Sequence, residues 1–499
     1  MDCNNTICFF QEGSRRYKSF NELVKDLNFN TVLNYMALET REDISWISDV
    51  ISFPLLEDEE IRKRQHLIQY LCENSRVIED AYNLICQSYN KYVTLFDLVK
   101  KGKKNIENCG TTISSCIEII HCLTEFVSLF GVFIEKYELD KKNEFSLLCN
   151  SFHKNEKSPF CSETASCIDA YKKKGEITLQ VNVGEGSKVS KIFFKSVYKK
   201  IQKRDFGLFK KKNGDCKVYK EDYVCEAGMN FADYFLVNLV KENWTEFQKW
   251  EDSFYCLRRQ SAFLYGCVKM YLRGLERGFY FCYPQLDTSD SKIVDLYELS
   301  LAFLSSTFPV SNDIELTDKK GVIVTGTNQG GKSTFLRSLG IAQVMFQSGM
   351  YVPATYYASK KYRQIFSHFT KREDSSMNTG RFEEELKRME YIIQNVEEDS
   401  LIISNETFCG TTEVTAAKVA MSIVEGIKNF SINLWMVTHI SQFAINLYNK
   451  DRSSYLFLSA AHTSEGQKHY KMIEKAPSNT SFGMELFQKV IDENVSSFV

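Results

Sequence analysis

The clearest structural signal in this chain is GVIVTGTNQGGKST, residues 321–334. An apolar run at residues 322–324 leads into a glycine-rich turn, and a helix-forming segment, FLRSL, follows from Phe335. A strand, a glycine-rich loop and a helix in direct succession are typical of an α/β domain built on a mostly parallel sheet. We therefore expect an α/β unit in the C-terminal part of the chain.

The turn fits the pattern G-x-x-x-x-G-K-[ST], whose fixed positions are Gly326, Gly331, Lys332 and Ser333. Glycines allow successive backbone N–H groups to curl around a polyphosphate, and the following helix directs its positive dipole end at the same oxygens. The ammonium of Lys332 then reaches the outer phosphates, and the hydroxyl of Ser333 reaches a Mg²⁺ ion. The alternative, a chance glycine-rich turn, is disfavoured because a strand pattern precedes the turn and a helix pattern follows it. The pattern predicts binding of a nucleoside triphosphate.

Composition limits the classes to which the protein can belong. The chain has 499 residues, of which 43% are hydrophobic and 25% charged, as in an ordinary globular protein. A formal net charge of −2 gives no overall attraction to nucleic acid, so any such contact must be local. Sixteen cysteines without a C-x-x-C pair argue against zinc sites. Because the sequence has no secretory signal and no long uncharged apolar run, we expect a soluble cytoplasmic protein with no membrane contact.

The spacing of apolar residues changes along the chain. Residues 61–82 and 116–134 repeat apolar side chains at helical spacing, which predicts two long amphipathic helices. Residues 177–183 alternate apolar and polar side chains before a Gly-Glu-Gly turn, and an apolar run at 192–194 follows, which predicts a hairpin. Helical spacing returns in residues 230–275. A largely helical first half is therefore expected to precede the α/β unit.

Several motifs, in a fixed order, resemble those of the MutS family. The loop TGTNQGGKST is similar to the family's TGPNMGGKST, and SLIISNE stands where the family has a strand that ends in Asp-Glu. Downstream, WMVTH resembles the strand that ends in the family's switch histidine. The segments that carry the resemblance are 311–314, 325–334, 347–354, 400–406, 410–412 and 435–439.

The resemblance implies an all-α lever and clamp region followed by an α/β domain, an ABC-type P-loop ATPase with a mostly parallel sheet. Four segments are implied: a helical core and lever domain in residues 1–175, a basic, partly β clamp-like segment in 176–230, returning lever helices and a connector in 231–298, and the ATPase domain in 299–499. Because the chain begins near the family's lever domain, a truncated form is also implied. It would lack the mismatch-reading and connector domains.

The resemblance further implies a site for ATP and Mg²⁺. Glu406 would be the catalytic base, with a solvated glutamate at a strand end as the alternative. His439 would sense the γ-phosphate, with a buried structural histidine as the alternative. Asn405 replaces the family's aspartate, so it and Ser333 would hold Mg²⁺ without a charge and hydrolysis would be slow. The nucleotide-binding residues would be Gly326, Thr327, Asn328, Gln329, Gly330, Gly331, Lys332, Ser333, Thr334, Asn312 and Ile314, and the catalytic residues Glu406, Lys332 and His439.

Residues 378–385 occupy the place of a family segment that completes the nucleotide site of a partner subunit. Gly380 stands where the family has the serine that touches the neighbouring phosphate, and Glu385 matches the family's glutamate. Arg381, next to this glycine, would act across the interface as an arginine finger. The alternative is an exposed arginine at the start of a helix.

The most basic stretch of the chain is a candidate for contact with the DNA backbone. Two phenylalanines, Phe206 and Phe209, stand among its charges. Engagement of several of these cations with phosphates predicts binding that weakens steeply with salt, whereas a charge run that is only a solvated face predicts none. The candidate residues are Lys195, Lys199, Lys200, Lys203, Arg204, Lys210, Lys211 and Lys212.

The resemblance implies a dimer, with a second copy or a paralogue, that grips mismatched, branched or otherwise distorted DNA as a nucleotide-gated clamp and hydrolyses ATP slowly. Two alternatives remain open at this point. One is a nucleotide-gated binding scaffold with little or no hydrolysis. The other is an ATPase that binds structured RNA or a ribosome.

Overall fold

The computed structural model describes residues 6–38, 41–102, 109–156, 176–183, 189–198, 244–286, 291–326, 329–370, 380–462 and 468–478. The chain forms two compact units. The first, the helical unit, comprises Met1–Phe10 and Asn74–Ser261, and the second, the α/β unit, comprises Gln11–Glu73 and Ala262–Val499. None of the helices in the described residues is both long and apolar enough to cross a membrane.

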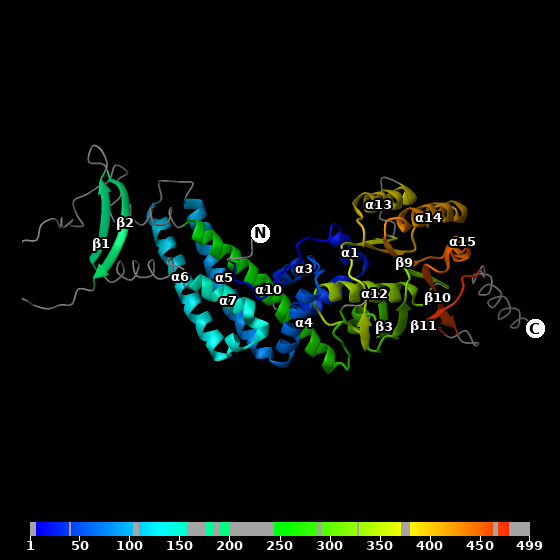
Figure 1. Cartoon of the computed structure of the whole chain (residues 1–499), viewed down its shortest axis with the longest axis horizontal. Helices are drawn as coiled ribbons and strands as arrows, with labels where there is room; N and C mark the ends of the chain where they lie inside the picture. Colours follow the sequence, from blue (N-terminus) through cyan, green and yellow to red (C-terminus); the bar gives the residue numbers. More distant parts are fainter. Residues whose placement is uncertain are drawn as a thin grey trace, which may run out of the picture. The chain divides into compact units, whose positions relative to one another are not determined.

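The helical unit is built on long helices (Figure 1), and aromatic side chains pack between them. Phe126 and Phe254 lie with ring centroids 4.7 Å apart, and the buried hydroxyl of Tyr92 donates a hydrogen bond to the carbonyl of Phe247 at 2.6 Å. Buried aromatic pairs of this kind stabilise a fold by more than the burial of their apolar area alone would. The helices are α5 (Ser75–Gly102), α6 (Cys109–Lys136), α7 (Ser146–Glu156) and the first part of α10 (Trp244–Glu276), with 3₁₀ turns at Leu139–Lys141 and Asn143–Phe145.

Of two elements predicted for the first half of the chain, the structure confirms one and contradicts the other. The hairpin is confirmed, because β1 (Glu176–Val183) pairs antiparallel with β2 (Val189–Tyr198). The single helix expected over residues 61–82 is wrong, since α4 (Asp58–Glu73) ends before α5 begins. The break falls at Asn74-Ser75, residue types that favour helix starts over helix interiors because their side chains compete for backbone hydrogen bonds.

The α/β unit contains a six-stranded sheet in the order β11-β10-β5-β9-β8-β7. All neighbouring strands are parallel except β11, which runs antiparallel to β10, so the predicted mostly parallel sheet is confirmed. The strands are β5 (Gly321–Thr325), β7 (Ile365–Phe369), β8 (Leu401–Asn405), β9 (Asn433–Val437), β10 (Tyr455–His462) and β11 (Lys468–Glu474).

Helices cover both faces of this sheet (Figure 1). On one face, Ile323, Ile402 and Met436 pack with apolar residues of α13 (Arg381–Asn395), α14 (Glu413–Lys428) and α15 (Ser441–Asp451). On the other lies α12 (Lys332–Gln347), where a Cβ on Gly340 would come within 3.1 Å of Ile403 Cδ1. Because the strands are covered on both sides, they read as continuous apolar runs rather than as alternating ones.

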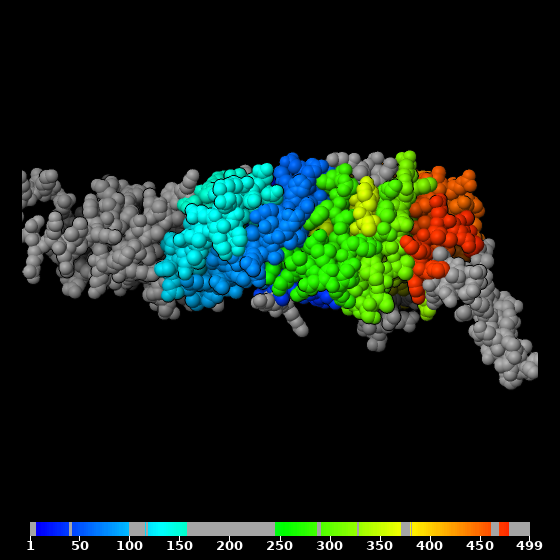
Figure 2. Space-filling view, turned by 90° about the horizontal axis from the view of Figure 1, so that it is seen from below, coloured from blue at the N-terminus to red at the C-terminus, as the bar shows by residue number. Residues whose placement is uncertain are grey.

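A second, three-stranded sheet in the order β4-β3-β6 flanks the first. Its strands are β3 (Ser291–Leu296), β4 (Asn312–Leu316) and β6 (Tyr356–Ala358), and the short helix α11 (Leu299–Leu304) follows β3. Strand β4 also contacts β11, and in Figure 2 the green residues of this region adjoin the red residues of β10 and β11.

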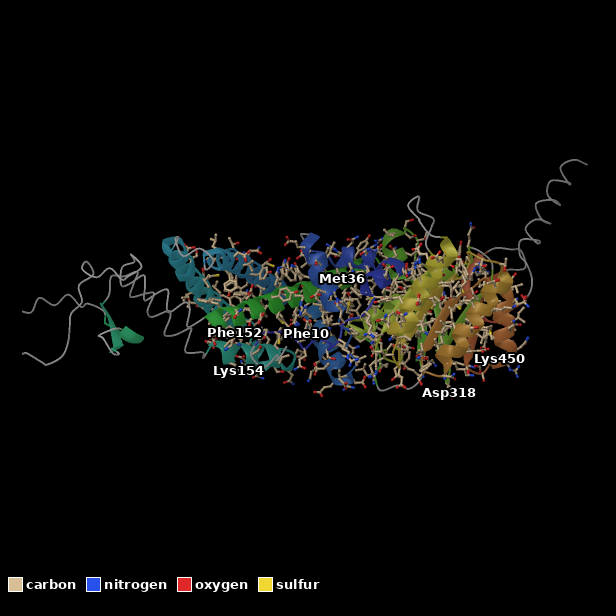
Figure 3. The ribbon with its side chains drawn as sticks, turned by 90° about the horizontal axis from the view of Figure 1, so that it is seen from above. Phe10, Met36, Phe152, Lys154, Asp318 and Lys450 are labelled. Atoms are coloured by element: carbon tan, nitrogen blue, oxygen red, sulfur yellow. The ribbon has the colours of Figure 1, made fainter. Side chains whose placement is uncertain are left out.

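Residues 11–73 pack with the α/β unit, although the sequence grouped them with the helical residues up to 175. Their helices are α1 (Phe20–Asp26), α2 (Phe29–Met36), α3 (Arg41–Ile51) and α4. Arg64 of α4 is 1% exposed and donates to Ser348 O at 3.1 Å and to Gln11 O at 2.6 Å; burial lowers its pKa to about 10. Met36 of α2, which is labelled in Figure 3, is completely buried. These contacts join residues far apart in sequence, so local patterns do not reveal them.

Candidate functional site

Three residues of the predicted site lie at the carboxyl ends of β5, β8 and β9. Gly326 follows β5, Glu406 follows β8, and His439 lies two residues after β9. These three strands are adjacent and parallel, so their carboxyl ends meet at one edge of the sheet. In open α/β sheets this edge, here called the carboxyl edge, is where ligands bind.

The loop between β5 and α12 has an unusual backbone. Gly326, Gln329 and Gly331 have φ angles of 118°, 61° and 85°, which lie in the left-handed region. Glycine adopts these angles without strain, whereas Gln329 does so at a cost of about 1 kcal/mol or more. Left-handed residues turn successive N–H groups toward one side, where they form a concave anion site. Thr327 and Asn328 lie outside the described residues.

Lys332 is the first residue of α12 and is only 3% exposed. Its Nζ donates to the carbonyl of Gly326 at 2.9 Å, so the ammonium lies inside the loop. Burial lowers the pKa of Lys332, and the nearby charge of Glu406 opposes the shift. A desolvated cation at a helix N-terminus attracts an anion strongly.

The two predicted metal ligands are in contact. Ser333 Oγ donates to Asn405 Oδ1 at 2.8 Å, and Asn405 is the last residue of β8. A hydroxyl and an amide oxygen are oxygen donors of the kind that Mg²⁺ accepts, and the ion usually keeps several water ligands as well. The donor set therefore fits Mg²⁺ chemically, although these two oxygens carry no charge. Thr334, the next residue, is half-buried beside them.

Glu406 is held in a defined backbone conformation. Its φ of 53° is left-handed, and its N–H donates to the carbonyl of Val437 at 2.9 Å. Its own carbonyl accepts from the Thr370 hydroxyl and from Cys409. The side chain is half-buried and interacts electrostatically with Lys332, which favours the site role over that of a solvated glutamate.

His439 is exposed, which removes the alternative of a buried structural histidine. Its imidazole is hydrogen-bonded to the thiol of Cys409, with Nε2 and Nδ1 at 3.5 and 3.8 Å from the sulfur. Sequence reasoning missed Cys409, since a cysteine between two recognised motifs gave no signal of its own. The pair links the segment after β8 to the segment after β9.

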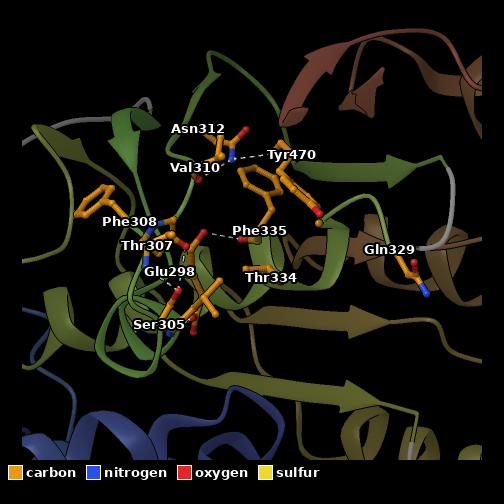
Figure 4. A pocket seen from close by; sticks show the side chains of 14 residues that line it. Glu298, Ser305, Thr307, Phe308, Val310, Asn312, Gln329, Thr334, Phe335 and Tyr470 are labelled. Atoms are coloured by element: carbon orange, nitrogen blue, oxygen red, sulfur yellow. Dashed lines mark hydrogen bonds between the residues drawn. The ribbon is translucent and has the colours of Figure 1, made fainter. Parts of the chain in front are cut away.

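A cavity of about 420 Å³ opens next to the loop (Figure 4). Asn312 lies in its wall, where Oδ1 accepts from Met472 N at 2.7 Å and Nδ2 donates to Tyr470 O at 3.4 Å. Ile314 is buried in β4 and is not among the lining residues. Glu298 contributes a buried carboxyl. Desolvation raises its pKa, and the hydrogen bonds that it accepts from Ser300 and Leu301 oppose this shift without cancelling it. Sequence reasoning missed the aromatic part of the lining, which comprises Phe308, Phe335 and Tyr470.

The candidates for action on a partner subunit differ in exposure. Gly380 is exposed and is the N-cap of α13. Glu385 is 5% exposed, which does not suit a side chain that must reach another subunit. A Cβ on Gly410 would lie 2.9 Å from the Phe382 backbone nitrogen, so the segment after Glu406 packs closely against the start of α13. The side chain of Arg381 lies outside the described residues.

The candidates for DNA contact are also outside the described residues, apart from the backbone of Lys195 in β2. Their role therefore stays a prediction.

One protein-family model matches the part of the chain that contains this site. Residues 322–494 match the family model MutS domain V, so the match spans the loop, Asn405, Glu406 and His439. By this match, residues 322–494 are similar to the MutS family. The chain is 32% identical to MutS protein homolog 4 of Mus musculus, over 27% of this chain and 14% of that protein.

Two other relatives are similar to part of this chain. Endonuclease MutS2 of Latilactobacillus sakei is 28% identical over 32% of this chain and 21% of its own length. The DNA mismatch repair protein MutS of Leuconostoc citreum is 26% identical over 36% of this chain and 21% of its own length. The matches thus cover between 14% and 21% of these three relatives.

Proposed function

We propose that this chain binds ATP with Mg²⁺ at the carboxyl edge, in an ABC-type P-loop ATPase domain, and hydrolyses it slowly. The observation that carries the proposal is the buried ammonium of Lys332, held 2.9 Å from Gly326 O at the start of α12. The ammonium and the N–H groups of the loop supply positive potential for the β and γ phosphates. A phosphate oxygen of the triphosphate would replace the carbonyl of Gly326 as the acceptor of the hydrogen bond from Lys332.

The neighbouring cavity suits the nucleoside. The rings of Phe308, Phe335 and Tyr470 provide apolar surface for a base, and Asn312 holds Tyr470 and Met472 in place through its amide. An apolar pocket with a few fixed polar groups is the usual form of a small-molecule site. Its position next to Gly331 and Thr334 connects it to the phosphate loop.

Glu406 is the proposed base or orienting group for the attacking water. Its backbone is fixed by bonds to Val437 and Thr370, so its carboxylate starts from a defined position. Ser333 and Asn405 are the residues that would hold Mg²⁺, which when bound neutralises charge that develops on the phosphates. A carboxylate at position 405 would add up to about 4 kcal/mol of attraction near 4 Å at an effective dielectric of 20, so its replacement by an amide favours slow turnover.

We further propose that ATP closes a dimer on distorted DNA. The relatives named MutS and mismatch repair protein support DNA as the polymer, and residues 176–230 supply a basic stretch. The start of α13, with Gly380 exposed, is the proposed contact with the nucleotide of a partner subunit, to which Arg381 would contribute its charge. The helical unit would act as the lever between the two functions. A cytoplasmic location remains a prediction from the sequence.

A second candidate is a nucleotide-gated scaffold without useful hydrolysis. It is favoured by one observation: the Ser333–Asn405 contact is made by two uncharged groups. Phosphate release measured with and without DNA separates the two candidates. Phosphate release above background, at a rate that changes when DNA is added, supports the ATPase. Tight ATP binding without phosphate release supports the scaffold.

The polymer is tested by gel shift with duplex DNA, a four-way junction and structured RNA at two salt concentrations. Preference for the junction, lost steeply at the higher salt concentration, supports the clamp. Preference for RNA would contradict the assignment to DNA.

A further inference from the structure

A buried ion pair lies next to the proposed site but outside it. Asp26, the last residue of α1, has a side chain that is 8% exposed. Its Oδ2 accepts from Arg388 Nη2 of α13 at 3.0 Å, from Ser367 Oγ at 2.8 Å and from Phe369 N at 3.3 Å. The Arg388 side chain is 17% exposed.

Both backbone groups of Phe369 are bound by this pair. Asp26 accepts from its N–H, and Arg388 Nη1 donates to its carbonyl at 2.7 Å. Phe369 is the last residue of β7 and stands in register with Asn405 on β8. The end of β7 is therefore fixed at the level of the proposed metal ligand.

The next residue transmits this restraint to the site. Thr370 N donates to Asn405 O at 3.2 Å, and the Thr370 hydroxyl donates to the carbonyl of Glu406. The helix that begins with Lys332 is also connected, because Arg337 Nε donates to Asp26 O at 3.3 Å. Asp26 thus joins four elements beside the proposed nucleotide site: its carboxylate connects α1 with β7 and α13, and its backbone carbonyl connects α1 with α12.

This connection is not explained by stability alone. Burial raises the pKa of Asp26, and the charge and hydrogen bonds of Arg388, Ser367 and Phe369 oppose that shift without cancelling it. A buried ion pair often stabilises a fold no better than apolar residues of the same shape would. The hydrogen bonds of this pair are directional: the guanidinium donates one bond to Asp26 and one to the carbonyl of Phe369, and it therefore fixes both groups.

We propose that Asp26 and Arg388 are positioning residues for the nucleotide site. They hold the end of β7 and, through Thr370, the backbone of Asn405 and Glu406. The pair touches neither phosphate nor metal in this role. The inference rests on the proposed ATPase and deepens it, because it assigns part of the catalytic geometry to the N-terminal helix α1.

The test compares the full chain with Asp26→Asn, Arg388→Met and the double variant. We expect each single change to lower kcat for phosphate release about tenfold or more, with the Kd for ATP within about threefold, since misplacement near a reacting group affects rate before binding. The double variant is expected to be no slower than the slower single one, because the two residues act as a unit. Arg388→Lys keeps the charge but not both bonds, so it is expected to resemble Arg388→Met.

Asp451→Asn is the matched control. Asp451 has a side chain that is 11% exposed and accepts from Lys428 and from two serines, Ser453 and Ser454, but it precedes β10 at the opposite edge of the sheet. An unchanged kcat in the Asp26 and Arg388 variants would overturn the inference. An equal loss of kcat in Asp451→Asn would also overturn it, because it would show a general effect of stability.

Hydrogen exchange keeps the inference testable if the protein binds ATP without turnover. In Asp26→Asn, the amides of Thr370 and Glu406 should exchange about tenfold faster or more, while those of residues 322–324 should not change. Unchanged exchange at Thr370 and Glu406 would refute positioning. Failure of the unmodified protein to bind ATP would instead refute the proposed function.

Discussion

The two edges of the six-stranded sheet are built from the same strands but with opposite chemistry. At the carboxyl edge, Lys332 is a buried cation whose pKa is lowered by desolvation. At the amino edge, Asp451 pairs with Lys428 at 2.5 Å and its pKa is lowered because hydrogen bonds and charge outweigh burial.

These shifts have the same direction but opposite effects on stability. A lowered pKa means that the folded protein disfavours the charged lysine but favours the charged aspartate. The amino edge therefore stabilises the fold, while the carboxyl edge holds a charge that costs stability until an anion arrives. Backbone strain does not separate the two edges, because left-handed non-glycine residues occur at both: Gln329 and Glu406 at the carboxyl edge, and Asp318, Asp399 and Ser431 at the amino edge.

The largest effect is expected for Glu406→Gln. Loss of the carboxylate removes the proposed base while keeping its shape, so phosphate release should fall by about 10²–10³-fold with little change in the Kd for ATP. Measurement of kcat and of nucleotide binding on the same preparation checks this. Glu425→Gln, an exposed change on α14, is the control and should leave both unchanged. Undiminished turnover in Glu406→Gln would remove Glu406 from the mechanism.

A smaller effect, in the opposite direction, is expected for Asn405→Asp. A carboxylate next to Ser333 would strengthen Mg²⁺ binding by about 1–2 kcal/mol, roughly a tenfold lower Mg²⁺ requirement for nucleotide binding. Titration of Mg²⁺ at fixed ATP measures it. Asn433→Asp, at the amino end of the neighbouring strand β9, is the matched control. An unchanged Mg²⁺ requirement would mean that residue 405 is not a metal ligand.

At the amino edge, the expected effect is on stability rather than on nucleotide chemistry. Asp451→Asn should lower the free energy of unfolding by about 1–2 kcal/mol at neutral pH, because it replaces charge-assisted hydrogen bonds by weaker ones. The lowered pKa of Asp451 means that its contribution is present above the aspartate's unfolded value near 4 and is lost as pH falls through the folded value. Denaturant unfolding of both proteins at neutral and at acidic pH should therefore show a difference that shrinks in acid. A difference that grows in acid would contradict the assignment.

Sequence reasoning was most successful where the structure is local. The strand, glycine-rich loop and helix around Lys332 follow one another directly, so periodicity and turn chemistry were sufficient. The contact between Ser333 and Asn405 could be predicted only because the resemblance assigned both residues as ligands of one Mg²⁺ ion. The angles of Gln329 and the burial of Lys332 needed the structure.

Other features depend on contacts between distant segments. Asp26 and Arg388 are separated by 362 positions, and no local pattern pairs them. The same holds for Arg64 and Ser348, which attach α4 to the end of α12. The buried position of Glu385 and the Cys409–His439 bond also arise from tertiary packing. A short break such as that at Asn74 lies below the resolution of helical periodicity.

The most direct test of the contrast between the edges is a comparison of Lys332→Ala with Lys320→Ala. These two lysines flank β5, with Lys320 at the amino edge, where its Nζ donates to Lys428 O at 3.0 Å. Titration with a fluorescent ATP analogue and thermal unfolding without nucleotide would be measured on both variants. We predict that Lys332→Ala loses about 100-fold in affinity or more without loss of thermal stability, while Lys320→Ala binds normally. Undiminished ATP binding by Lys332→Ala would contradict the account.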